Sequence, residues 1–158
     1  HGQAREGKVS SGPENRFIQS IHQLLPARVY RMKNHNPYVG GVADCWYSGD
    51  VGDLWVEYKY LILPKRASTI VDLCSGDRPP LSALQQDWLR ARHREGRAVG
   101  VILGTPEGGV WLPGTAWENP LSVTECASSM RAKKDLASLI VENVCRSSHR
   151  TTPTHKGG

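Results

Sequence analysis

The sequence predicts an α/β domain in which one central mixed β-sheet is flanked by helices. Helical and strand patterns alternate in the order helix, strands, helix, strands, helix, with no internal repeat. A chain of 158 residues is also long enough to bury one core without metal or disulfide support. We therefore expect one ordered domain over residues 13–145, preceded by a flexible lead (1–12) and followed by a basic disordered tail (146–158).

The first helix is predicted at residues 13–26, because apolar side chains recur there at helical spacing. These side chains are Phe17, Ile18, Ile21, Leu24 and Leu25. Ser11 supplies a capping hydroxyl, and Pro13 is compatible with the first turn. Glu14 shares the inward face of this helix. Its carboxylate either serves a site or is simply favourable at a helix N-terminus.

Strands are predicted at residues 29–32, 42–47 and 54–63, where β-branched and aromatic residues are frequent. The last two form a hairpin around the turn-prone segment 48–53. On the third strand Val56, Tyr58, Tyr60 and Ile62 point to one face, and Glu57, Lys59 and Leu61 to the other. The following basic segment, 64–80, is expected to be a surface loop.

The second half of the chain predicts a helix over 81–96, strands at 99–103 and 109–112, and a last helix. Leu81, Leu84, Trp88 and Leu89 give the first of these helices its apolar spacing, and Ser82 lies near its cap. The last helix is indicated by Met130, Leu136, Leu139, Ile140 and Val144. Together these elements continue the sheet and cover it.

Composition and charge narrow the function classes. No apolar run approaches the roughly 20 residues that cross a bilayer, and the polar start lacks a signal-peptide stretch, so we expect a cytoplasmic protein without a membrane partner. The net charge of +5 favours an acidic partner such as nucleic acid. Four widely spaced cysteines, Cys45, Cys74, Cys126 and Cys145, are expected to be mostly buried thiols, with two disulfides as the alternative.

Charged residues inside the predicted hairpin are the candidates for chemistry. Glu57 and Lys59 share one face of an otherwise apolar strand, and the hairpin can place Asp44 beside Glu57. Two neighbouring carboxylates repel each other, and a hard divalent cation relieves that repulsion. Lys59 could then lower the pKa of an attacking water and stabilise negative charge on phosphorus. The alternative is a same-strand ion pair of Glu57 and Lys59, with Asp44 as a turn residue.

At this point the sequence resembles the PD-(D/E)XK nuclease superfamily, in particular its virus-type replication-repair (VRR-NUC) branch and the phage Holliday-junction resolvases. The resemblance covers about residues 14–112. It is carried by Glu14, the segments 31–34 and 41–44, Glu57-Tyr58-Lys59, the segment 81–89, Gly96 and the strand 98–102. Ala43 departs from the pattern, because the family usually has proline before the first aspartate.

The resemblance implies a restriction-endonuclease-like core and a metal-dependent phosphodiesterase. Asp44, Glu57, the Tyr58 backbone carbonyl and Glu14 would hold Mg²⁺ or Mn²⁺, and Lys59 would be the catalytic lysine. Gln85 falls where that branch places a glutamine, whose amide could bond a ligating carboxylate or a phosphate. The alternative for Gln85 is a solvated helix position.

Basic side chains around the hairpin are expected to contact DNA phosphates, although each alone could be a solvated surface charge. They are Arg31, Lys33, His35, Lys65 and Arg66. The leading hypothesis is a Mg²⁺-dependent endonuclease of phage origin that acts on branched DNA during recombination. A four-way junction presents two equivalent cuts, so a homodimer is expected. The alternatives are a non-catalytic basic DNA-binding module and a general structure-tolerant nuclease.

Overall fold

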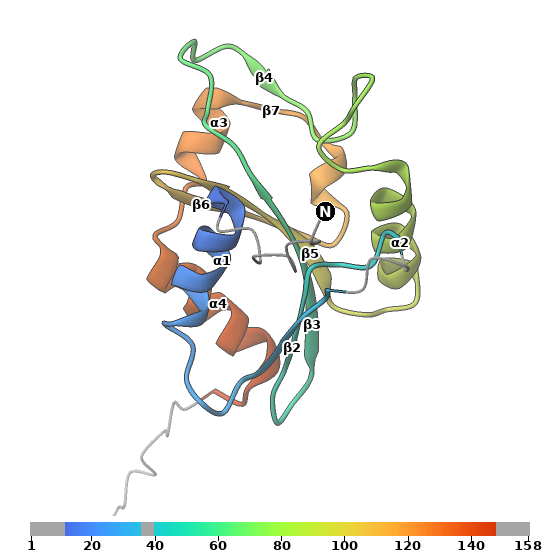
Figure 1. Ribbon diagram of the computed structural model, residues 1–158, viewed down its shortest axis with the longest axis vertical. Coiled ribbons are helices and arrows are strands. Elements are labelled where there is room, and N and C mark those ends of the chain that lie inside the picture. Colours follow the sequence, from blue (N-terminus) through green and yellow to red (C-terminus); the bar gives the residue numbers. More distant parts are fainter. Residues whose placement is uncertain (1–11, 36–39, 148–158) are drawn as a thin grey trace, which may run out of the picture.

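The computed structural model describes residues 12–35 and 40–147, which form the predicted mixed sheet flanked by helices (Figure 1). Most of the expected lead and tail, 1–11 and 148–158, lies outside the described residues. The sheet has the strand order β1-β2-β3-β5-β6. Its strands are β1 (Tyr30–Lys33), β2 (Cys45–Ser48), β3 (Asp53–Tyr60), β5 (Val99–Thr105) and β6 (Gly108–Pro113). Only β3 and β5 are parallel, so the sheet is mixed as predicted.

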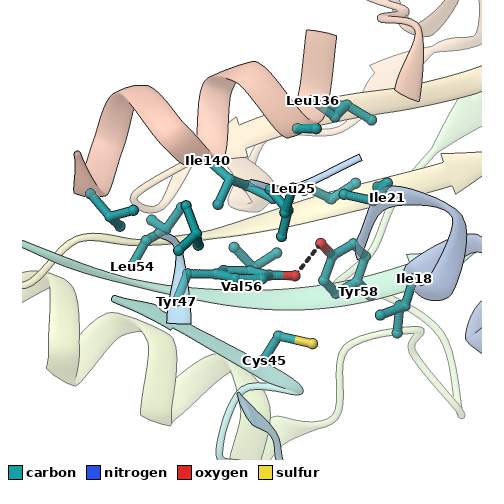
Figure 2. Packing of buried hydrophobic residues seen from close by; sticks show 14 of the residues in the cluster. Ile18, Ile21, Leu25, Cys45, Tyr47, Leu54, Val56, Tyr58, Leu136 and Ile140 are labelled. Atoms are coloured by element: carbon teal, nitrogen blue, oxygen red, sulfur yellow. Dashed lines mark hydrogen bonds between the residues drawn. The ribbon is translucent and has the colours of Figure 1, made fainter. Parts of the chain in front are cut away.

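Helices cover both faces of this sheet (Figure 1). Helices α1 (Pro13–His22) and α4 (Lys133–Val144) pack together on one face, and α2 (Ala83–Arg94) packs on the other, against β5. The α1 face buries Ile18, Ile21, Val56 and Ile140, among other residues (Figure 2). A second cluster around Leu81, Leu89 and Trp117 lies on the α2 face. The amphipathic patterns of α1 and α4 therefore identify the inward faces of these two helices correctly.

The pairing of β2 with β3 determines which side chains of the hairpin lie opposite each other. Cys45 pairs with Val56, so Asp44, just before β2, lies across from Glu57 in β3. The parallel pairing of β3 with β5 brings the C-terminal ends of both strands to this same edge of the sheet. Side chains at the end of β3 therefore meet the first turns of the surrounding helices.

A chain of polar groups crosses the α1 face of the core. The hydroxyl groups of Tyr47 and Tyr58 are hydrogen-bonded at 2.7 Å (Figure 2), and His22 Nε2 lies 2.7 Å from the Tyr47 hydroxyl. Burial is the main cause that lowers the pKa of His22 to about 4, and Arg31 and Lys33 lower it further. His22 is therefore held neutral inside the packed helix face.

Several boundaries differ from the sequence predictions. Helix α1 begins after Gly12 with no side-chain cap and ends at His22, so Leu24 is 50% exposed beyond it. Leu84 is 63% exposed on α2, and Ile62, beyond the end of β3, is 76% exposed. Each of these apolar residues follows the periodic pattern of the sequence, but it lies outside the part of its element that packs against the core. Met130 also precedes α4 rather than belonging to it.

A small second sheet was not predicted. Strands β4 (Ile70–Val71) and β7 (Leu121–Ser122) pair between the expected loop and the short elements η1 (Ala116–Glu118) and α3 (Val123–Ser128). The backbone N–H groups of Val123 and Thr124 donate to the carbonyls of Thr69 and Ala67. The basic segment 64–80 is therefore attached to the domain at one side.

The described cysteines are free thiols, and three of the four are buried, in agreement with the sequence expectation. No helix in the described ranges is both long enough and apolar enough to cross a membrane. The expected tail begins at Arg146, and its backbone N–H donates to Asp50 Oδ1 at 2.8 Å. The first residue of that segment is thus bound to the β2–β3 loop.

Candidate active site

Asp44 and Glu57 are side by side at the edge of the sheet. Asp44 Oδ2 accepts a hydrogen bond from the Tyr58 backbone N–H at 3.0 Å, which fixes its carboxylate beside β3. The Glu57 side chain is only 1% exposed. Its Oε2 atom is buried with no hydrogen-bond partner among the described residues. Because a buried polar atom without a partner is costly, this oxygen is a candidate position for a proton, a water molecule or a cation.

The environment of Glu57 opposes its negative charge. Burial, then the nearby Asp44 carboxylate, raises the pKa of Glu57 to about 10, and Lys59 acts in the opposite direction. Two neighbouring carboxylates repel each other unless a proton or a cation lies between them. The pair is therefore arranged to share a proton or another cation.

Lys59 lies on the same face of β3 as Glu57, as the alternation predicts. Its Nζ atom is 3.7 Å from Glu57 Oε1, and its side chain is 20% exposed. The ammonium group therefore reaches solvent, while its contact with the carboxylate keeps it at the site. The alternative raised from sequence, a same-strand ion pair, is present in the structure, but Asp44 is part of the same cluster.

Gln85 joins helix α2 to this cluster. Its Nε2 atom donates to Glu57 Oε1 at 3.1 Å. The same amide closes a capping box at the start of α2, because its Oε1 accepts from the Ser82 N–H at 3.0 Å. Gln85 therefore bonds a candidate ligand rather than facing only solvent. Gln86 instead donates to the Leu81 carbonyl at 2.8 Å, inside the second core.

Glu14 approaches from the other side of the sheet edge. Burial first, then the Asp44 carboxylate, raises the pKa of Glu14, and Lys59 and Lys33 lower it. Lys33 in β1, Asp44 just before β2 and Lys59 in β3 therefore all act on the Glu14 carboxylate in α1. The inward face predicted for Glu14 is confirmed by its partial burial.

The donor set fits a hard divalent cation. Carboxylate oxygens are its preferred ligands, and the unpartnered Glu57 Oε2 beside Asp44 provides such a position. Within residues 12–35 and 40–147, no group of three or more His, Cys, Asp or Glu side chains is arranged to hold a metal ion. Asp44 and Glu57 are the two carboxylates that could hold such an ion, and metal binding by these residues, by the Tyr58 carbonyl and by Glu14 stays a prediction.

The expected DNA-contact residues divide into two groups. Lys33 is half-buried and its Nζ donates to the Asn15 side chain in α1, which places it at the site. Arg31 and His35 are exposed on and after β1, while Lys65 and Arg66 are exposed on the segment before β4. Sequence reasoning missed the contact between Lys33 and Asn15, because nothing in a pattern pairs a helix residue with a strand residue 18 positions away.

Comparisons with known proteins support the fold assignment. No family model and no curated protein matches the chain. A solved structure, that of Archaeoglobus fulgidus Hjc, a Holliday junction resolvase from an archaeal hyperthermophile, is similar with a TM-score of 0.52 and 16% sequence identity. The match covers 78% of this chain and 98% of that chain. The chain therefore shares the α/β fold of that resolvase, with a central mixed sheet flanked by helices.

Proposed function

We propose that the protein is a metal-dependent endodeoxyribonuclease that hydrolyses phosphodiester bonds. The observation that carries this proposal is the Asp44–Glu57 pair, in which Glu57 is buried and its Oε2 has no hydrogen-bond partner among the described residues. A carboxylate pair of this kind, with a lysine beside it, suits phosphoryl chemistry. The fold shared with an archaeal resolvase supports the same proposal.

Each residue has a distinct role in this proposal. Asp44 and Glu57 would hold Mg²⁺ or Mn²⁺, with the Tyr58 carbonyl and Glu14 as further ligands by resemblance. The cation would polarise the phosphate and lower the pKa of the attacking water. Lys59 Nζ, 3.7 Å from Glu57, orients this water or stabilises the charge that develops on phosphorus. Gln85 positions the Glu57 carboxylate through its 3.1 Å hydrogen bond.

We further propose that the substrate is branched DNA and that two copies of the chain act together. The support is that Hjc, which shares this fold, is a Holliday junction resolvase. A symmetric junction offers two equivalent bonds, and each chain carries only one set of Asp44, Glu57 and Lys59. A dimer would supply the second set.

One experiment separates this function from its alternatives. Radiolabelled single-stranded, duplex, flap and four-way DNA substrates are incubated with the protein in Mg²⁺ or in EDTA, and sedimentation gives the oligomeric state. We expect the protein to be a dimer and to cleave the four-way substrate in Mg²⁺ but not in EDTA. Equal cutting of duplex and junction by a monomer would favour a general structure-tolerant nuclease. Binding without cleavage in any metal would favour a non-catalytic DNA-binding module.

A further inference from the structure

A polar pocket lies on the α1 face of the sheet, at the C-terminal ends of β3 and β5. Its volume is about 210 Å³, and its lining includes the cationic side chains of Arg16 and Lys133. The remaining lining residues are uncharged, with Phe17, Tyr60 and Thr105 among them. Glu14 and Glu107 are neighbours in the chain but do not line it. Among the residues that the structure describes, the lining of this pocket has two positive charges and no negative one.

The walls of the pocket are rigid. Phe17 is 3% exposed, and its ring lies 6.0 Å from the Tyr60 ring, centroid to centroid. A Cβ atom at Gly104 would lie 2.8 Å from Phe17 Cδ1, so only glycine lets this ring lie against β5. Lys133 Nζ is 5.7 Å from the centroid of the same ring. The Phe17 ring therefore separates the pocket from the core and supports the Lys133 ammonium group.

The positive charge of Lys133 does not stabilise helix α4. It is the first residue of that helix, where a positive charge is unfavourable next to the unpaired N–H groups. No salt bridge found among the described residues pairs Lys133 with a carboxylate. The Phe17 ring holds the ammonium group at the pocket, where its charge is available to an anion.

The pocket adjoins the catalytic residues on two elements at once. Pro13 lines it and immediately precedes Glu14 in α1, and Tyr60 lines it and immediately follows Lys59 in β3. Tyr60 and Lys59 project from opposite faces of β3, so the pocket lies at the same end of this strand as Lys59 but on the α1 face of the sheet. A DNA strand carries one phosphate per roughly 3.4 Å of helix axis. A DNA strand that passes from Asp44 and Glu57 around this end of β3 would bring a neighbouring phosphate to the pocket.

We propose that the pocket of Arg16 and Lys133 binds a non-reacting phosphate of the same DNA strand, close to the phosphate that is cleaved. This inference rests on the proposed nuclease function and extends it to a second contact on the substrate backbone. The two cations hold the strand in register across the sheet edge, so that the scissile phosphate is placed at the carboxylate pair. Their role is to position the substrate, and the chemistry stays with Asp44, Glu57 and Lys59.

The test compares Lys133→Gln with Lys134→Gln. Both variants remove one positive charge from the first turn of α4, but Lys134 lines a different pocket. Lys133→Gln should raise KM for DNA about 5- to 10-fold, leave kcat within twofold, and lower the slope of log affinity against log salt by about 1. Lys134→Gln should change KM by less than twofold. Equal effects of the two variants would overturn the proposal.

A substrate change locates the phosphate. Single neutral methylphosphonates are placed in turn at each of the three positions on either side of the cut. With the unchanged protein, a methylphosphonate at one of these positions should raise KM by the same factor as the Lys133→Gln substitution does. With the Lys133→Gln variant, the same methylphosphonate should not raise KM any further. If every position acts additively with Lys133→Gln, the pocket binds no specific phosphate.

Binding measured without catalysis keeps the two proposals apart. The dinucleotide pTpT is titrated in EDTA against ¹⁵N-labelled protein, and the Arg16 side-chain and Lys133 backbone signals are followed. Saturable shifts at both, lost in Lys133→Gln, support the anion site even if no DNA is cleaved. Active cleavage without any shift at these groups would overturn the site and leave the nuclease function intact.

Discussion

The side-chain amide of Gln85 holds Glu57 and the first turn of α2 at the same time. Its Nε2 donates to Glu57 Oε1 at 3.1 Å, and its Oε1 accepts from Ser82 N–H at 3.0 Å. A residue that looks like an ordinary capping glutamine therefore connects helix α2 to a carboxylate 28 positions earlier in the chain. The orientation of Glu57 depends on where this helix starts.

Replacing Gln85 should separate stability from activity. Gln85→Ala and Ser82→Ala both break the capping box, and each should cost about 0.5–2 kcal/mol in the free energy of unfolding. Only Gln85→Ala also releases Glu57, so it alone should lower kcat, by about 10- to 100-fold. Chemical denaturation and single-turnover cleavage measure the two effects. A Ser82→Ala variant that loses as much activity would contradict the role given to Gln85.

Asp44→Asn should abolish Mg²⁺-dependent cleavage while the protein stays folded. Asparagine keeps an oxygen that can accept the Tyr58 N–H, so the hydrogen bond that fixes residue 44 remains possible. Glu57→Gln should have the same effect, because each change removes a charged ligand. DNA binding measured by anisotropy in EDTA should stay within about threefold. Full cleavage by either variant would remove the pair from the site.

Lys59 and Lys65 should differ in which kinetic constant they change. Lys59 is beside Glu57, so Lys59→Ala should lower kcat by about 10²- to 10³-fold with little effect on KM. Lys65 is exposed on the segment before β4, so Lys65→Ala should change only KM, by a few-fold. Steady-state kinetics on one substrate measures both. If Lys59→Ala alters KM alone, Lys59 is a phosphate contact.

The metal-free protein should lose stability as pH rises. The pKa of Glu57 is about 10 in the folded state and 4.5 as its ordinary value, so between these values the folded state holds a proton that the unfolded chain releases. The melting temperature in EDTA should therefore fall from pH 6.5 to 9, and Glu57→Gln should flatten this slope. Glu107→Gln, at an exposed position, is the control. An unchanged slope in Glu57→Gln would contradict the burial of this charge.

His22 should make the protein less stable as the pH falls, the opposite of the effect of Glu57. Its pKa of about 4 lies below the ordinary 6.5, so in this window the unfolded chain binds the additional proton. Stability should therefore fall as pH drops from 6.5 to 5. His22→Gln should reduce this fall because glutamine does not titrate and can still bond Tyr47. His93→Gln, on the exposed side of α2, is the control and should retain the full pH dependence.

The strongly periodic parts of the chain could be predicted from sequence. Alternation in β3 puts Glu57 and Lys59 on one face, and the hairpin length brings Asp44 opposite Glu57, as the register confirms. Helix α2 follows from its apolar spacing and its Ser82 cap. These elements are determined by local patterns, which a single sequence contains.

The remaining features depend on contacts that no local pattern contains. Strands β4 and β7 have two residues each, too few to show alternation. The exposure of Leu84 is decided by where the packed surface of α2 ends. The pocket of Arg16 and Lys133 joins residues 117 positions apart, and only the packing of α1 beside α4 brings them together.

Glu57 has a buried oxygen without a hydrogen-bond partner among the described residues, so selection for stability and selection for activity favour different side chains at this position. A population of this protein selected for heat resistance alone should acquire neutral side chains at residue 57 early, because the folded state gains from losing that charge. Selection for DNA cleavage should retain the glutamate at the expense of heat resistance. The residue found at position 57 after many generations would therefore show whether thermal stability or DNA cleavage had been under selection.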